Sequence, residues 1–176
     1  MEKIKDITLK EFLKIFPEAT FPAVISKDSI IEFSRNNIAL PAVAIAKYIN
    51  TWDPDPSEFV EYIPCFKFKI EKEFVAVVYY KAELLKYEYF LAILDKKGNL
   101  VSRKVIAGLI SDGKNTVQSA ATITEDFSIH IAGANDAGSH LFDGNNSKQI
   151  YMEILANGQI ISINDENTND KTQEKK

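Results

Sequence analysis

The side chains best suited to chemistry gather in one irregular segment, Gly133 to Lys148. It carries Asn135, Asp136, His140 and Asp143, and His130 lies just before it. Imidazole and carboxylate groups of this kind can ligate zinc, and a catalytic zinc needs about three protein ligands held rigidly. Here two or three of those ligands would come from a single Gly-rich loop. The pattern therefore favours a solvent loop of turn-forming residues over a metal centre.

Two other constellations in the same segment are incomplete. Asp143 begins an oxygen-rich stretch like a calcium loop, but Lys148 stands where Gly is required and no Glu follows at position twelve. A Ser–His–Asp arrangement could use Ser139 or Ser119 with His140, but no Gly-x-Ser-x-Gly elbow accompanies it. Nucleotide-binding glycine motifs are also missing from the sequence. We therefore expect no catalytic residues, no metal and no cofactor.

Aromatic side chains concentrate between residues 52 and 90. They include Trp52, Phe66, Phe68, Tyr79, Tyr80, Tyr87, Tyr89 and Phe90. This set either fills a core layer or forms an exposed patch, in which Tyr79, Tyr87 and Tyr89 would be binding residues. Leu84-Leu85, flanked by Lys81, Glu83, Lys86 and Glu88, suits either a recognition edge with a mixed-charge rim or an ordinary hairpin loop.

Residues 1–50 follow helical patterns. Thr8 and Glu11 fit a capping box, which predicts a short helix that Pro17 ends. A second helix is expected over residues 28–35, capped by Ser26 or Asp28, with Ile30, Ile31 and Phe33 facing inward. A third begins after Pro41 and runs to about Asn50. Such short helices need a surface to pack on, and a Pro-rich connector (51–58) joins them to the rest of the chain.

Residues 59–163 carry strand and hairpin signals. Segments 74–80 and 87–94 are apolar on both faces, which predicts central strands covered on both sides. Residues 90–102 are echoed by 151–162, each pair of strand segments joined by a turn that ends in Gly98 or Gly158. We expect Asn157-Gly158 to form a two-residue type I′ turn.

These patterns predict an α+β fold, in which N-terminal short helices pack on a mostly antiparallel meander of about six to eight strands. The sheet would be strongly bent or a half-barrel. Residues 1–163 would form one domain, followed by a disordered tail from 164 to 176 that has no apolar residue.

Composition narrows the classes of partner. The formal net charge is −4, and Arg35 and Arg103 are the only arginines, so binding to nucleic acid is not expected.

Cys65 is the single cysteine, which leaves no intramolecular disulfide, and its position at a strand start predicts a buried, inert thiol. Without a secretory signal or a long apolar run, we expect a cytoplasmic protein with no membrane association. Its Lys, Ile and Asn bias is typical of an AT-rich bacterial genome.

The leading hypothesis is a non-enzymatic bacterial protein that binds a protein partner through its sheet face or edge and the 133–148 loop. Inhibitor- and immunity-like proteins often share this acidic, motif-free profile. The alternatives are a small-molecule-binding or metal-dependent enzyme with its site between that loop and the sheet, and a half-barrel that holds a ligand. A pocket lined by Tyr79, Tyr87 and His130 would favour the alternatives. A flat exposed aromatic patch, or a sheet edge paired with a second molecule, would favour the first hypothesis.

Overall fold

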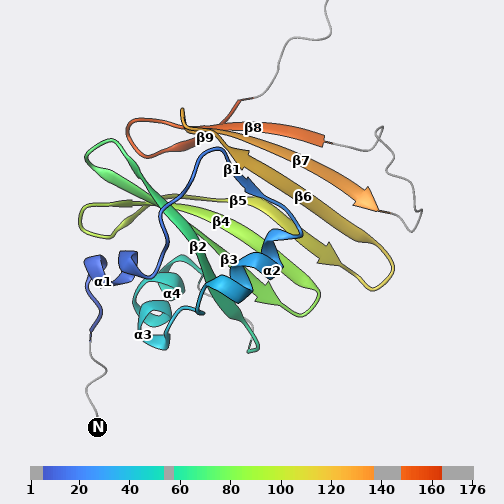
Figure 1. Cartoon of the computed structure of the whole chain (residues 1–176), viewed down its shortest axis with the longest axis horizontal. Coiled ribbons are helices and arrows are strands. Elements are labelled where there is room, and N and C mark those ends of the chain that lie inside the picture. The colour runs from blue at the N-terminus through green and yellow to red at the C-terminus, as the bar shows by residue number, and fades with distance from the viewer. Residues whose placement is uncertain (1–5, 54–57, 137–147, 164–176) are drawn as a thin grey trace, which may run out of the picture.

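The computed structural model describes residues 6–53, 58–136 and 148–163. In these ranges the chain forms short helices and one open antiparallel sheet of nine strands (Figure 1). The prediction of an α+β fold with a meander sheet is confirmed. None of the described helices is long and apolar enough to cross a membrane.

The first helix, α1, spans Leu9–Lys14 and begins at the predicted capping box. The Thr8 amide donates to the Glu11 carboxylate at 2.9 Å, and the Glu11 amide donates to Thr8 Oγ1 at 3.3 Å. These two bonds satisfy donors that the first turn of a helix leaves unpaired. With only six residues, α1 depends on its packing against the sheet.

The second helix, α2, spans Ser29–Asn36, close to its predicted position. Asp28 is the N-cap residue but makes no side-chain capping bond; instead, the Ser29 hydroxyl accepts from the Ser26 amide at 2.9 Å. Ile31, expected to face inward, is exposed, whereas Ile30 and Phe33 pack on the core. Because α2 is amphipathic with a narrow apolar stripe, adjacent Ile30 and Ile31 cannot both face the sheet.

A continuous helical run follows Pro41. It consists of α3 (Ala42–Ala44), the π-helical turn η1 (Ile45–Ile49) and α4 (Asn50–Trp52). The run thus extends two residues into the predicted connector. Its last turn buries Trp52 against the sheet, which explains why the helix passes the predicted end.

Eight strands run in sequence order across the sheet, and each pairs with the next. They are β2 (Glu61–Ile70), β3 (Phe74–Glu83), β4 (Lys86–Asp95), β5 (Leu100–Ser111), β6 (Thr116–Ile123), β7 (Ser128–Asp136), β8 (Lys148–Ile154) and β9 (Ile160–Ile163). The ninth, β1 (Ala23–Ile25), pairs with the end of β6 and was not predicted. A strand of three residues carries too short a pattern to be recognised in sequence.

The sheet bends between β5 and β6, which pair only from Gly108 to Ser111 on the β5 side. Past that point the two strands part, and β1 pairs with β6 instead. At the far end of the sheet, the Ile160 amide of β9 donates to Ser102 Oγ of β5 at 3.2 Å. The second half of the sheet therefore folds back towards the first, as a half-barrel requires.

Two apolar cores result from this bend. One lies between the two halves of the sheet, and the other lies beneath α1 and the 42–52 run (Figure 1). Successive residues of β3 alternate between them, with Val78 and Tyr80 in the first core and Val77 and Tyr79 in the second. The prediction that 74–80 and 87–94 are covered on both faces is confirmed for residues 76–80 and 89–94, whereas 74, 75, 87 and 88 are half-buried.

The two echoed hairpins share one loop geometry. The Gly98 amide donates to Asp95 O and the Gly158 amide to Leu155 O, and both glycines have positive φ. Asn157 does not have positive φ, so the expected type I′ turn is wrong. Its loop is the longer form in which a single glycine takes the left-handed position.

Candidate interaction surface

The tyrosines predicted to bind a partner lie in the interior or at its margin. Tyr79 and Tyr89 are buried in different cores, on opposite faces of the sheet, and Tyr87 is half-buried beside the same core as Tyr89. They therefore do not line one pocket with His130. The wider aromatic set, including Trp52, is also mainly core.

Of the site residues predicted on β7 and after it, only some lie in the described part of the chain. His130 is exposed on β7, and its ring meets the Tyr151 ring edge-on with 5.0 Å between centroids. Asn135 and Asp136 are the last residues of β7, so residues 133–136 belong to a strand and the expected loop 133–148 is shorter than predicted. His140 and Asp143 lie outside the described residues. Among the residues described, no cluster of three His, Cys, Asp or Glu side chains could hold a metal.

Exposed apolar side chains gather at one end of the sheet, around the turn between β3 and β4. We call these five residues the tip surface: Phe59 (84% exposed), Leu84 (89%), Leu85 (50%), Ile110 (44%) and Val117 (46%).

The register of the strands brings the tip surface together. Lys86 pairs with Ile110, and Ile110 pairs with Val117, so these side chains form one row across β4, β5 and β6. The Ser111 amide donates to Leu85 O at 2.9 Å, which joins the two neighbouring hairpins. Glu61 pairs with Ala82, which puts Phe59 at the same end of the sheet as Leu84.

The turn that presents Leu84 and Leu85 has an unusual sequence for its shape. Leu85 has φ +60°, in the left-handed region that favours glycine or asparagine. A side chain with a Cβ in this conformation costs roughly 1–2 kcal/mol. The chain uses glycine at three other turn positions of positive φ, which are Gly98, Gly113 and Gly158, whereas the turn between β2 and β3 has Glu71 at φ +52°.

The strain at Leu85 is not offset by packing. Phe127 also has positive φ, but its ring stacks on Phe68 at 5.7 Å between centroids. Leu85 instead remains half exposed. An exposed leucine in a conformation unfavourable to it is the kind of local conflict that often marks a functional position.

A partly buried group of charges lies directly behind the tip surface. Lys81 Nζ lies 2.8 Å from Asp53 Oδ2 and 3.4 Å from Glu83 Oε1, and the Lys81 side chain is only 8% exposed. The Tyr62 hydroxyl donates to Asp53 Oδ2 at 2.9 Å. Burial works against ionisation of Asp53, but the bonds from Lys81 and Tyr62 outweigh it, so the pKa of this carboxyl lies below its ordinary value.

Neighbouring pairs extend this group. Lys86 Nζ lies 2.9 Å from Glu88 Oε2, and the strand register pairs Lys81 with Glu88 and Glu83 with Lys86. Charges of opposite sign therefore alternate across the two strands that lead into the turn, which stabilises the hairpin. The predicted mixed-charge environment of Leu84-Leu85 is present.

Arg103 fixes the end of the helical run to the sheet below this group. Its Nε donates to the Tyr79 hydroxyl at 3.0 Å, and its Nη1 donates to Trp52 O at 2.9 Å. The guanidinium also lies over the Phe90 ring, 3.9 Å from the centroid. Burial raises the pKa of Tyr79 to about 12, although Arg103 lowers it. The phenol is thus neutral and serves as a fixed acceptor.

Compared with protein-family models, with curated proteins and with solved structures, the chain matches none. We therefore infer the function from the residues of the site alone.

Sequence reasoning identified Leu84 and Leu85 but missed Phe59, Ile110 and Val117. Phe59 follows the predicted connector, and Ile110 and Val117 lie on either side of the predicted turn at 111–114. Polar residues are expected near turns, so the apolar character of these three residues was the available signal. Their proximity depends on strand register, which the sequence pattern left open.

Proposed function

We propose that this protein binds a protein partner through the tip surface. The single observation that supports the proposal most is the turn itself, where an exposed Leu-Leu pair replaces the expected glycine at positive φ. A surface turn without a binding role would be more stable with Gly or Asn in place of Leu85. Contact with another molecule would account for leucine at this position.

The energetics are adequate for a specific complex. Full burial of a Leu or Phe side chain contributes about 1.5–3 kcal/mol. Burial of Phe59, Leu84 and Leu85 would therefore supply a substantial part of the roughly 8 kcal/mol that corresponds to micromolar affinity. The charge pairs behind the turn hold the leucines in place before binding, which lowers the entropy cost of association.

The partner that fits best is a different protein with an apolar depression and a polar margin. The chain carries a net charge of −4, so two copies repel each other weakly, which disfavours self-association. The tip surface protrudes at a hairpin end, and a projecting apolar pair needs a concave receptor. At its margin, Lys86, whose side chain is 40% exposed, offers a positive charge to the partner.

Affinity capture from cells that contain the natural partner tests this proposal. Three immobilised proteins are compared: the wild type, Leu84→Lys, and Leu100→Lys as a control at an exposed leucine outside the tip surface. We expect one protein to be retained by the wild type and by Leu100→Lys, and its retention to fall at least about tenfold with Leu84→Lys.

Two outcomes would overturn the proposal. Retention of the same proteins by all three baits would show that the tip surface is not the contact site. A wild-type dimer in sedimentation that Leu84→Lys converts to a monomer would show that the surface joins two copies of this chain.

A further inference from the structure

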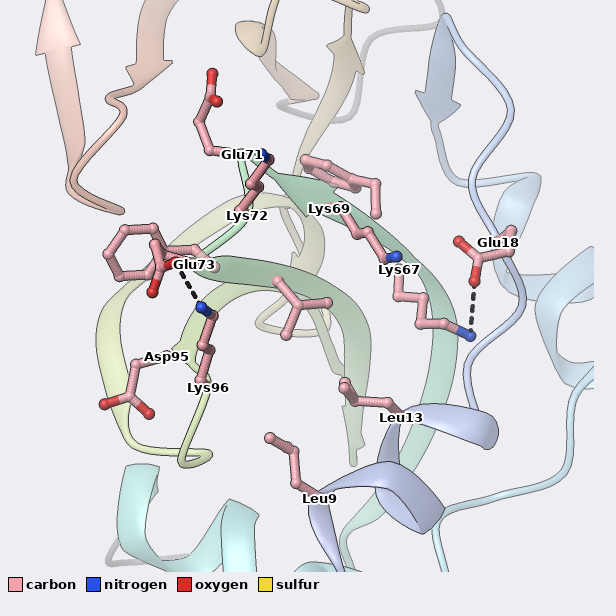
Figure 2. A pocket seen from close by; sticks show the side chains of 13 residues that line it. Leu9, Leu13, Glu18, Lys67, Lys69, Glu71, Lys72, Glu73, Asp95 and Lys96 are labelled. Carbon is pink, nitrogen blue, oxygen red and sulfur yellow. Dashed lines mark hydrogen bonds and ion pairs between the residues drawn. The ribbon is translucent and has the colours of Figure 1, made fainter.

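A pocket lies at the opposite end of β3 from the tip surface (Figure 2). Its volume is about 410 Å³, within the ordinary range of small-molecule sites. Three separate parts of the chain form it: α1 together with Glu18 beyond it, the hairpin between β2 and β3, and the turn after β4. Its position and its mixture of apolar and charged lining make it distinct from the tip surface.

The apolar part of the lining consists of half-buried side chains. Leu9 and Leu13 project from α1 on one side (Figure 2). Val75, at the start of β3, lies on the sheet face that packs against α1 and forms the floor. The helix α1 has six residues and leaves this corner of the sheet uncovered. The free energy falls when a hydrocarbon group covers apolar surface of this kind, because both surfaces are removed from water.

Most of the charges around the pocket neutralise one another. Lys67 Nζ donates to Phe16 O at 2.6 Å and lies 3.2 Å from Glu18 Oε1. On the other side, Lys96 Nζ lies 2.5 Å from Glu73 Oε1. Figure 2 shows both ion pairs at the margin of the pocket, from opposite sides.

Asp95, the remaining carboxylate on the Lys96 side, is also satisfied. It accepts hydrogen bonds from the Asn99 side chain and backbone and from the Lys97 amide. These bonds lower the pKa of Asp95. The carboxylate is thus occupied by its own turn and does not compensate a lysine in the pocket.

Two lysines of the lining, Lys69 and Lys72, have no ion pair within the described ranges, and Lys69 is the one that the strand register places beside the apolar floor. It pairs with Val75 in the strand register, two residues beyond Lys67, so all three side chains share one face of the sheet. Within the described ranges it has no ion pair or hydrogen bond to its ammonium group. Figure 2 shows its side chain reaching alongside Lys67, while Glu71 points away from the pocket.

We propose that this pocket binds a medium-chain aliphatic carboxylate. The hydrocarbon chain covers Leu9, Leu13 and Val75, and the carboxylate meets the Lys69 ammonium. The exposed Lys69 ammonium offers a charge-assisted contact that an uncharged hydrocarbon cannot use, and a small anion would leave the apolar floor exposed. The occupant that satisfies both parts carries an anionic head and an apolar chain.

Titration with three probes tests the inference: decanoate, decanol, which keeps the chain without the charge, and acetate, which keeps the charge without the chain. Amide shifts of residues around the pocket in ¹H–¹⁵N spectra report binding. We expect decanoate to bind with a Kd that is millimolar or tighter, and decanol and acetate to bind more weakly. Lys69→Ala should weaken decanoate binding about three- to fivefold. Lys104→Ala, at an exposed lysine outside the pocket, should leave decanoate binding unchanged.

The inference is overturned if decanoate does not bind, if decanol binds equally well, or if Lys69→Ala and Lys104→Ala have the same effect. Leu84→Lys should leave decanoate binding intact, because the tip surface is at the other end of β3. Failure here and failure of the proposed partner binding can therefore be told apart.

Discussion

The ammonium of Lys81 lies 2.8 Å from Oδ2 of Asp53, joining the end of the helical run to the strand that leads into the tip surface. Both side chains are largely buried, and Tyr62 donates a further hydrogen bond to the same carboxylate oxygen. Breaking a buried ion pair leaves the other charge without adequate compensation. This contact is therefore expected to be important for the stability of the region behind the tip.

Asp53→Asn should lower the free energy of unfolding at neutral pH by about 1–3 kcal/mol, because it weakens two hydrogen bonds to a charged acceptor. The folded-state pKa of Asp53 lies below its unfolded value, so the stability it contributes is present above the unfolded pKa and is lost as pH falls through the folded pKa. The difference between wild type and variant should thus shrink below about pH 4. Urea denaturation at several pH values measures it, and a difference that is constant with pH would argue against the ion pair.

Two tyrosines of similar burial should respond in opposite ways to removal of their hydroxyl. The Tyr79 hydroxyl accepts from Arg103, whereas the Tyr89 hydroxyl is buried with no hydrogen-bond partner in the described part of the chain. We expect Tyr79→Phe to destabilise the protein by about 1 kcal/mol or more and Tyr89→Phe to be neutral or stabilising. Thermal unfolding of both variants checks this, and equal destabilisation would contradict the assigned contacts.

Leu85→Gly should raise the free energy of unfolding by roughly 1 kcal/mol, because glycine adopts φ +60° without the steric cost. The same change should weaken partner binding, since it removes an apolar contact. The matched control is Leu100→Gly, at an exposed leucine in a strand, where glycine should destabilise by about 0.5–1 kcal/mol. Chemical denaturation of the two variants gives the comparison. A loss of stability in Leu85→Gly would mean that the leucine is retained for packing.

Local signals predicted much of the fold. The capping box at Thr8 and the glycines at 98, 113 and 158 each act within a few residues, so the sequence specifies them directly. Apolar residues on both faces of β3 and β4 likewise indicated strands that are covered on each side. Leu84 and Leu85 could be singled out because polar residues are expected in a hairpin turn.

Features that depend on long-range geometry could not be predicted. The pairing of Asp53 with Lys81 requires the helical run to dock on a particular strand, and nothing near either residue specifies that partner. β1 is stabilised by pairing with the end of β6, almost a hundred residues later in the chain. The tip surface likewise needs the register of β4, β5 and β6 before Ile110 and Val117 become neighbours of the turn.

Site-specific photo-crosslinking tests the central claim most directly. A photoreactive residue is placed at position 59, 84 or 110 in the tip surface, or at the exposed control positions Val24 and Ile161. The proposal predicts crosslinks to one and the same protein from the three tip positions and none from the two controls. Crosslinks from Val24 or Ile161 with none from the tip would contradict it.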